Sequence, residues 1–202
     1  MIGLTENSGG TPLYQLKITL MYSDPAIWRR MVVPADTKLN RLHDVIQRVM
    51  PWTNSHLHHF IAGDRRKRGS EPVYYGMVNL DFADPDDRTL NEEKFTLADL
   101  AAAEKCKFIY EYDFGDGWEH EILVEKVLPP DASFKKFVCL AGENACPPDD
   151  CGGIGGYYDL LEILKDPDAP DHEHLKEWIG GKWDAARFDL KAANAALKKL
   201  KL

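Results

Sequence analysis

Residues 110–122, YEYDFGDGWEHEI, constrain the fold more than any other part of the sequence. Aromatic or aliphatic residues alternate with acidic ones on both sides of a Gly-Asp-Gly sequence, which is the pattern of two strands joined by a tight turn. Two turn lengths compete. A two-residue loop would place Asp113 opposite His120, whereas a three-residue loop would place Tyr112 opposite His120.

We expect the three-residue loop, with Gly117 at positive φ, because it keeps the rings and aliphatic side chains of the ribbon on one face, which can then be buried. The opposite face would carry four acidic residues: Glu111, Asp113, Glu119 and Glu121. Like charges directly across two strands are destabilising unless solvent, a cation or basic side chains attend them. A screened acidic surface, complemented by Arg29 and Arg30, is the simpler alternative to a divalent metal site on this face.

The composition is that of a globular protein with one domain. The chain has 202 residues, and 44% of them are hydrophobic, which is enough for a core. Its 33 acidic residues exceed its 25 lysines and arginines, so the formal charge is -8 and the average field repels nucleic acid. The basic sequence DRRKRG at residues 64–69 could touch an acidic partner, but such a patch is more often a solvated loop.

No segment has the pattern of an export signal or a membrane span. The first residues, MIGLTENSGGTP, lack a basic region followed by an apolar stretch, and no later apolar run approaches bilayer length. We therefore expect a cytoplasmic protein with no membrane contact. Its four cysteines are then expected to be reduced thiols.

Hydrophobic periodicity predicts strands on both sides of an early helix. Apolar side chains recur at helical spacing over residues 39–50, where Asp36 or Thr37 can cap the start and Pro51 ends the pattern. His43 lies on the apolar stripe of this helix, where a histidine is more often a core residue than a ligand. We expect strands at residues 13–22, 28–35, 56–62 and 73–77, an Asp/Pro-rich loop at 81–89, and helices at 97–103, 157–165, 173–179 and 190–200.

The order of these elements argues for an α+β fold with a mixed or largely antiparallel sheet and an early helix packed on it. The opening strand, strand, helix, strand order is compatible with a β-grasp-like start. We expect a disordered tail at residues 1–12 and a single domain at residues 13–202, mainly helical over 155–202. The Cys-, Pro- and Gly-rich stretch from residue 139 to 156 predicts a structured loop without periodicity.

Three cysteines lie close together in that stretch, with six and four intervening residues: Cys139, Cys146 and Cys151. This spacing is neither a paired CxxC ribbon nor a Cys2His2 finger. Zinc would need a fourth ligand, for which His56, His58, His120 and Cys106 are the candidates. The alternative is that these are small buried thiols that pack a Pro/Gly loop.

No reaction-defining motif accompanies these residues, so the sequence leaves open whether the protein is an enzyme. It contains no GxSxG elbow, no HExxH helix and no deaminase HxE with PCxxC. The GGIGG sequence at residues 152–156 lacks the GxGxxG spacing and the Walker lysine, and it follows two aspartates that would repel phosphate. It predicts a glycine turn into a helix.

Four sequence segments together resemble the plasmid pRiA4b open-reading-frame-three-like family. They are IWRR, LHDVIQRVMPW followed by HLHHF, YDFGDGWEH, and ACPPDDCGGIGGYYDLL, and the resemblance spans about residues 14–190. The family has no established activity, so the resemblance implies the fold more than the function. The chain departs from the family's usual CPPED at Asp149, whose shorter carboxylate keeps the charge but shortens the reach.

The family pattern also implies a set of positions that do not look like core. We expect them to converge on one concave surface at one end of the sheet. The set comprises Trp28, Arg29, Arg30, His43, His56, His58, Asp113, Asp116, Trp118, His120, Asp149, Asp150 and Tyr157.

The function we expect from such a surface is binding: an interaction module that recognises a polypeptide or a small ligand. The alternative is a metal-dependent hydrolase-like enzyme that uses His120, Asp113 and the pair His56 and His58. A third reading, a nucleic-acid accessory protein, is suggested by the basic patch and by the association of the family with mobile elements. No cofactor is certain from the sequence, and zinc, held by Cys139, Cys146, Cys151 and His120, is the candidate.

Overall fold

The computed structural model describes residues 10–63, 69, 71–78, 88–181 and 183–200. Most of the expected N-terminal tail, nearly all of the basic patch at 64–69 and most of the Asp/Pro-rich loop lie outside these residues. Of the tail, residues 10–12 are described, and there the carbonyl of Pro12 accepts a hydrogen bond from the backbone of Ala35 (2.9 Å). None of the described helices has both the length and the apolar character needed to cross a bilayer.

Among the described residues, eight strands form one mixed sheet in the order β5-β4-β3-β6-β7-β1-β2-β8, which confirms the predicted α+β class. The pair β4 and β5 is parallel, and the other neighbouring pairs are antiparallel. The strands are β1 (Leu13–Leu20), β2 (Ile27–Pro34), β3 (His58–Ala62), β4 (Val73–Gly76), β5 (Leu90–Asn91), β6 (Lys107–Tyr112), β7 (Trp118–Leu128) and β8 (Val138–Glu143).

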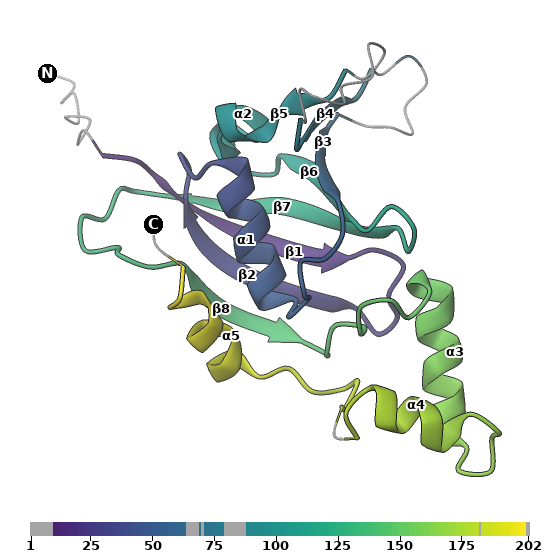
Figure 1. Ribbon diagram of the computed structural model, residues 1–202. Helices are drawn as coiled ribbons and strands as arrows, with labels where there is room; N and C mark the ends of the chain where they lie inside the picture. The colour runs from purple at the N-terminus through teal and green to yellow at the C-terminus, as the bar shows by residue number, and fades with distance from the viewer. Residues whose placement is uncertain (1–9, 64–68, 70, 79–87, 182, 201–202) are drawn as a thin grey trace, which may run out of the picture.

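The helices cover one face of this sheet and extend from one of its ends (Figure 1). The early helix crosses the middle of the sheet and buries its apolar stripe there, as its periodicity predicts. The third and fourth helices extend away from the sheet, and the fifth lies against β8. The helices are α1 (Leu39–Val49), α2 (Leu97–Leu100), α3 (Gly153–Lys165), α4 (His172–Trp178) and α5 (Leu190–Leu197), with a 3-10 turn η1 (Glu92–Lys94) before α2.

The start of α1 differs from the expected cap. Its N-cap residue is Lys38, and neither Asp36 nor Thr37 caps it. Both residues are engaged in the turn after β2: the Asp36 carboxylate accepts a hydrogen bond from Thr11 Oγ1 (2.8 Å), and the Thr37 carbonyl accepts one from the backbone of Leu97 (2.9 Å). This turn, rather than a side-chain cap, fixes where the helix begins.

The β-grasp-like start is not the arrangement that the strands adopt. Strand β3, which follows α1, pairs with β4 and β6, and two strands separate it from β1. The central hairpin β6–β7 occupies that place instead, because β7 pairs along the full length of β1. The early helix therefore connects the two halves of a wider sheet.

Strand β8 is absent from the sequence prediction, which treated residues 139–156 as loop. It forms the sheet edge beside β2 with a register shift between Arg30 and Met31. The side chain of Asn194, on α5, brackets it: the Cys139 backbone N–H donates to Asn194 Oδ1 (3.0 Å), and Asn194 Nδ2 donates to the Cys139 carbonyl (2.9 Å). An amide from α5 thus satisfies one residue of the exposed edge.

The hairpin register differs from both predicted turns. Tyr112 pairs with Trp118 and Tyr110 pairs with His120, so residues 113–117 form a five-residue loop. Two residues more than the three-residue prediction is an even shift, and an even shift leaves every strand residue on its predicted face. The rings of Tyr110, Tyr112 and Trp118 are therefore buried as expected. Asp113 leaves the acidic face and enters the loop, and so does Phe114, which is 50% exposed where the prediction had it facing Trp118 on the buried face.

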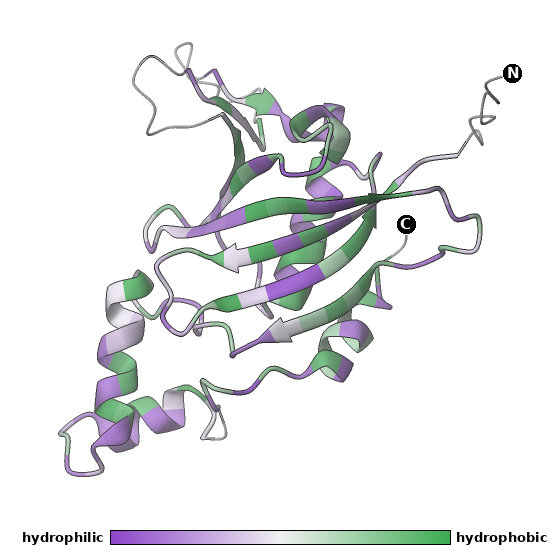
Figure 2. Ribbon diagram, turned by 180° about the vertical axis from the view of Figure 1, so that it is seen from behind, coloured by the Kyte–Doolittle hydropathy of each residue, from purple (hydrophilic) through white to green (hydrophobic). Residues whose placement is uncertain are grey.

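The other face of the sheet is not covered by a helix within the described residues. Seen from that side, the strands lie in front of α1 and alternate in hydropathy along their length (Figure 2). The protein therefore has one buried sheet face and one face of mixed polar and apolar residues.

Candidate functional site

Two loops meet the β6–β7 hairpin loop at one end of the sheet, beside the start of α3 (Figure 1). They are residues 51–57, after α1, and residues 144–152, which lead into α3. The Gly152 N–H donates to Asp116 Oδ2 (3.1 Å). Gly153 has φ of +68°, and a Cβ there would lie 2.4 Å from the Asp116 carbonyl oxygen, so this close approach of the two chains requires glycine.

Two carboxylates and one imidazole converge where these loops meet. His56 Nε2 lies 2.8 Å from Asp150 Oδ1 and 3.6 Å from Asp113 Oδ2. One ligand-type atom from each of the three residues lies within 4.8 Å of the others, and the described part of the chain holds no second group of three such His, Cys, Asp or Glu side chains. Asp113 is buried, His56 is half-buried and Asp150 is exposed, so the group opens to solvent. We call these three residues the His/Asp site.

The hairpin loop holds Asp113 with one carboxylate oxygen free of the loop. Its φ is +56°, its carbonyl accepts a hydrogen bond from the Gly117 N–H (2.6 Å), and its Oδ1 accepts from the N–H groups of Gly115 (2.9 Å) and Asp116 (3.3 Å). Asn and Asp tolerate this left-handed conformation best after glycine. Oδ1 thus closes the loop, and Oδ2 is the atom that approaches His56.

A neighbouring aspartate fixes the two longer loops to each other. Asp149 Oδ2 accepts hydrogen bonds from the backbone N–H (2.7 Å) and Oγ1 (2.6 Å) of Thr53. Asp149 Oδ1 is buried and has no hydrogen-bond partner among the described residues. Close by, Trp52 Nε1 donates to the carbonyl of Pro147 (3.0 Å). Asp149, which stands where the family usually has glutamate, therefore makes two short hydrogen bonds with its shorter side chain.

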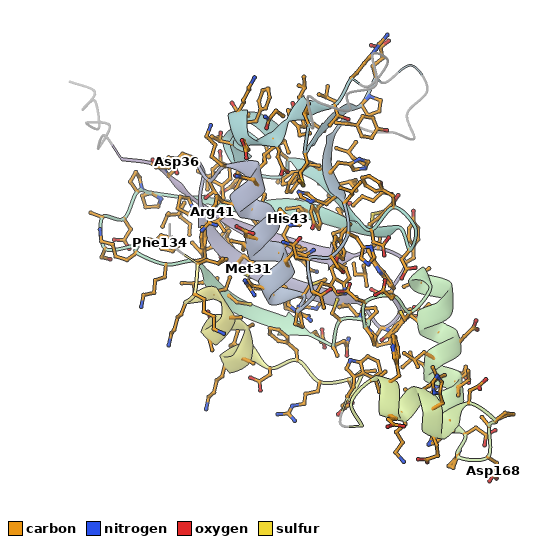
Figure 3. All side chains as sticks on the ribbon, in the orientation of Figure 1. Met31, Asp36, Arg41, His43, Phe134 and Asp168 are labelled. Atoms are coloured by element: carbon orange, nitrogen blue, oxygen red, sulfur yellow. The ribbon has the colours of Figure 1, made fainter. Side chains whose placement is uncertain are left out.

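Two of the other candidate histidines form a buried network under α1. The rings of His43 and His58 stack at 3.5 Å, and His58 Nε2 lies 2.9 Å from Glu92 Oε2. His43 Nδ1 lies 2.8 Å from the hydroxyl of Tyr110, and His43 Nε2 lies 2.7 Å from Asn54 Oδ1. Burial, and to a lesser extent the charge of His58, lowers the pKa of His43 to about 4. His43, labelled beside α1 in Figure 3, is buried and is therefore a core residue, as its place on the apolar stripe predicts.

His120 is also buried, on the helix-covered face of β7. Its Nδ1 lies 3.2 Å from the carbonyl of Tyr110, and burial lowers its pKa to about 4. Its ring contacts Trp52 edge-on at 5.0 Å. Its Nε2 and the Nε1 of Trp118 are buried without a hydrogen-bond partner among the described residues. His120 therefore belongs to the aromatic core and not to the His/Asp site.

The cysteines form no metal-type group among the described residues, and Cys106, just before β6, lies at the other end of the sheet from the hairpin loop. Cys139 and Cys146 are buried, Cys151 and Cys106 are half-buried, and all four are free. Burial raises the pKa of Cys139 to about 11 and that of Cys151 to about 12, and it raises the pKa of Cys146 well above its ordinary value. These thiols are accordingly protonated at neutral pH.

The expected single surface is divided by the two-residue period of β2. Arg29 points to the helix-covered face, where its guanidinium donates to the carbonyls of Val49 (3.0 Å), Trp28 (2.8 Å) and Glu143 (2.9 Å). Trp28 and Arg30 lie on the open face. The expectation of one shared surface is therefore wrong for these positions, because successive strand residues point to opposite sides.

Tyr157, on α3, is buried with its ring against Trp183, and burial raises its pKa to about 12. It lies in the core beneath the loops and adds no polar group to the His/Asp site.

The acids of the hairpin's open face contact side chains other than those expected. Glu111 faces Glu119 across the strands, and His59 Nε2 lies 2.9 Å from Glu111 Oε2. Lys107 Nζ lies 2.9 Å from Glu121 Oε1. Arg30 instead binds the next acid along β7, Glu125, through two hydrogen bonds of 2.6 and 2.8 Å, which lower the pKa of that carboxyl. Arg30 and Lys107 thus form ion pairs on this face, and His59 contacts Glu111 directly.

Two contributors to these sites were missed in the sequence. Thr53 supplies both hydrogen bonds to Asp149, and Glu92 is the acceptor for His58. Glu92 lies 34 residues from His58 in the chain, so no spacing pattern could identify it. For Thr53 the run of small polar residues between Trp52 and His56 was the available signal.

Comparison with known proteins places this chain in a group without assigned activity. The family model described as plasmid pRiA4b ORF-3-like protein matches residues 12–192, which confirms the resemblance read from the four segments. The chain is 36% identical over 188 residues to the uncharacterized protein y4hQ of Sinorhizobium fredii, covering 92% of this chain and 91% of that protein. It is similar to the crystal structure of MM3350, a protein of unknown function from Methanosarcina mazei Go1, with a TM-score of 0.78 and 33% identity over 90% of this chain and 97% of that one.

Proposed function

The chain belongs to the plasmid pRiA4b ORF-3-like family, and from that premise we propose that it is a divalent-metal-dependent binding protein whose His/Asp site holds the ion. One observation carries the proposal: an imidazole nitrogen and two carboxylate oxygens from three separate loops lie within 4.8 Å of one another. A simple ion pair needs only His56 and Asp150. The approach of a second carboxylate, Asp113, to the same nitrogen is what a shared cation would favour.

The ligand types select the ion. Imidazole suits zinc and other first-row transition metals, whereas carboxylates also accept manganese and magnesium. A set of one imidazole and two carboxylates is best matched by Zn²⁺ or Mn²⁺. We therefore propose zinc on His56, Asp113 and Asp150 in preference to the cysteine set with His120 predicted from the sequence, because the cysteines belong to no group of three ligand-type side chains among the described residues.

Three protein ligands leave coordination positions for a bound molecule. Catalytic and ligand-binding metal sites keep such a position open, whereas structural zinc sites use four protein ligands. Asp150 is exposed, so the open side of the site faces solvent. We propose that a polypeptide or small molecule binds there through a donor atom of its own.

Hydrolysis by the same ion is the second candidate. The observation that favours it is Asp149 Oδ1, a buried carboxylate oxygen without a protein partner among the described residues, next in sequence to the ligand Asp150. A metal-bound water is activated when a base can accept its proton. In this version the residues are His56, Asp113, Asp149 and Asp150, in place of His120 and His58.

The metal proposal is tested by calorimetric titration of chelator-treated protein with Zn²⁺ and with Mn²⁺. We expect one ion per chain for the wild type and at least a tenfold weaker affinity for Asp113→Asn and for Asp150→Asn. Asp113→Asn is the sharper variant, since an amide oxygen can still accept the loop hydrogen bonds made by Oδ1.

Two controls separate the His/Asp site from its neighbours. Asp168→Asn removes an exposed carboxylate at the far end of the α3–α4 pair (Figure 3) and should bind the ion like the wild type. A Cys139→Ser, Cys146→Ser, Cys151→Ser protein should also keep it. Loss of the ion in the cysteine variant, or unchanged binding in Asp113→Asn, would overturn the proposal.

A further inference from the structure

A cleft of about 380 Å³ lies between α3 and α4, directly beside the His/Asp site. This is at the lower end of the range for small-molecule pockets. One wall is apolar and the rim is acidic. The apolar side chains are Leu160, Ile163, Leu175 and Trp178, and the carboxylates are Asp150 and Asp159.

The charge at this cleft is one-sided. Within the described residues no lysine or arginine lines it. Asp159, which is exposed on α3, makes no hydrogen bond or ion pair with the described part of the chain, so its carboxylate is available to a ligand. His174 lines the cleft as well, and it leaves the rim negative when its imidazole is neutral.

The apolar side of the cleft is also accessible. Trp178 is 45% exposed although its neighbours Leu160 and Ile163 turn toward the cleft, so a large ring surface is left open there. An indole ring attracts a cation to its face, and an apolar wall covers an alkyl stem. An anionic ligand would meet two carboxylates at the rim instead.

We propose that this cleft binds an alkyl amine or guanidinium, the chemistry of a lysine or arginine side chain, with the stem on the apolar wall and the charge at Asp159. Asp150 is common to the cleft and to the His/Asp site. The inference therefore deepens the proposed function by naming the ligand class, and it rests on that function only in placing the cation next to a bound metal ion.

The test is a titration of metal-free protein with Nα-acetyl-lysine amide at pH 8, where imidazoles are neutral, followed by two-dimensional NMR. The probe for the stem alone is Nα-acetyl-norleucine amide, which lacks the charge. We expect the lysine derivative to bind at least about fivefold more tightly than the norleucine derivative, and Asp159→Asn to remove that preference. Asp168→Asn should keep it.

The same experiment can overturn the inference. Equal affinity for the two probes, an unchanged preference in Asp159→Asn, or no saturation with the lysine derivative up to about 10 mM would each do so. Trp178→Leu, which keeps an apolar wall, should weaken binding of the lysine derivative about threefold and leave the norleucine derivative unaffected. If the lysine derivative binds, two further probes distinguish the source of the ligand. A tripeptide with a central lysine that binds more tightly than the lysine derivative assigns the ligand to polypeptides. Tighter binding of 1,5-diaminopentane than of the lysine derivative assigns it to free amines.

The two proposals fail separately. Asp113→Asn protein should bind Zn²⁺ and Mn²⁺ at least tenfold more weakly and still bind the lysine derivative like the wild type, because Asp113 does not line the cleft. Lysine binding without any metal binding by the wild type would reject the proposed function and keep the cleft. Metal binding without any preference for lysine would do the opposite.

Discussion

Two histidine–carboxylate pairs in this protein have nearly the same length and different surroundings. His58 Nε2 lies 2.9 Å from Glu92 Oε2 under α1, and His56 Nε2 lies 2.8 Å from Asp150 Oδ1 at the end of the sheet. The side chains of the first pair are 3% and 5% exposed, and those of the second are 31% and 65% exposed. Each pair thus joins an imidazole to a carboxylate at nearly the same distance, and the main difference between them is burial.

The buried pair is part of a network in which ring nitrogens of His43 and His58 contact hydrogen-bonding partners. His58 stacks on His43, whose two ring nitrogens both have partners, and Tyr110 also accepts a hydrogen bond from Gln47 Nε2 (3.0 Å). Such a network gives the core a unique arrangement and leaves little to offer a ligand. At the His/Asp site Asp113 and Asp150 each keep one carboxylate oxygen free of hydrogen bonds to the described residues, and Asp150 faces solvent. The difference teaches that ligand atoms that are both unused and open to solvent, more than residue type, mark a candidate site.

The largest expected effect is the pH dependence of the buried imidazoles. The pKa of His43 and that of His120 are lowered by burial from 6.5 to about 4. Between these values the unfolded chain binds protons that the folded chain does not, so stability is full above pH 6.5 and falls as the pH falls toward 4. From pH 7 to pH 5 the two groups should together cost about 4 kcal/mol of unfolding free energy.

Urea unfolding followed by tryptophan fluorescence at a series of pH values measures this loss. A His43→Gln protein should lose about half of the contribution that the two buried imidazoles make to the pH dependence. Equal slopes in the wild type and His43→Gln would show that His43 does not carry the effect.

Breaking the buried pair is the next largest effect. Glu92→Leu leaves the His58 ring in the core without its acceptor, and we expect a loss of about 3 kcal/mol in unfolding free energy at pH 7. The matched control is Glu93→Leu, because Glu93 is the exposed neighbour on the same 3-10 turn. If the two variants were equally stable, the network under α1 would not be the rigid core element described above.

Most of the fold could be predicted from the sequence, because the hydrophobic periodicity of a strand or helix is a local pattern. The alternation in residues 110–122 assigned the buried and open faces correctly, although the loop was two residues longer than expected. The apolar stripe of α1 was equally clear. Strand β8 was missed because VCLAGE carries no clean alternation, and its place in the sheet depends on β2 and on Asn194 of α5.

The sequence predicted the residues of the site only as members of a longer list of candidates, and it did not show which of them lie together. His56, Asp113 and Asp150 were all candidates, but so were Trp28, which lies on the other face, and His120, which lies in the core. What brings the three together is the left-handed conformation of Asp113 and the contact of the hairpin loop with the start of α3. Neither is encoded in a spacing pattern, because both depend on loops far apart in the chain.

The smallest expected effect on stability is that of Asp150→Asn, and it tests the comparison of the exposed pair with the buried pair most directly. Asp150→Asn alters the exposed pair while keeping its size, and an exposed ion pair contributes little, so the metal-free protein should lose less than about 1 kcal/mol. Its decisive property is the response to metal. At the same concentration of Zn²⁺ or Mn²⁺ the melting temperature of the wild type should rise, since an ion that binds only the folded state stabilises it, and that of Asp150→Asn, which binds the ion at least tenfold more weakly, should rise less. Thermal unfolding with and without the ion measures both quantities. A large loss in the metal-free variant would instead make the exposed pair a structural element like the buried one, and the contrast between the two regions would disappear.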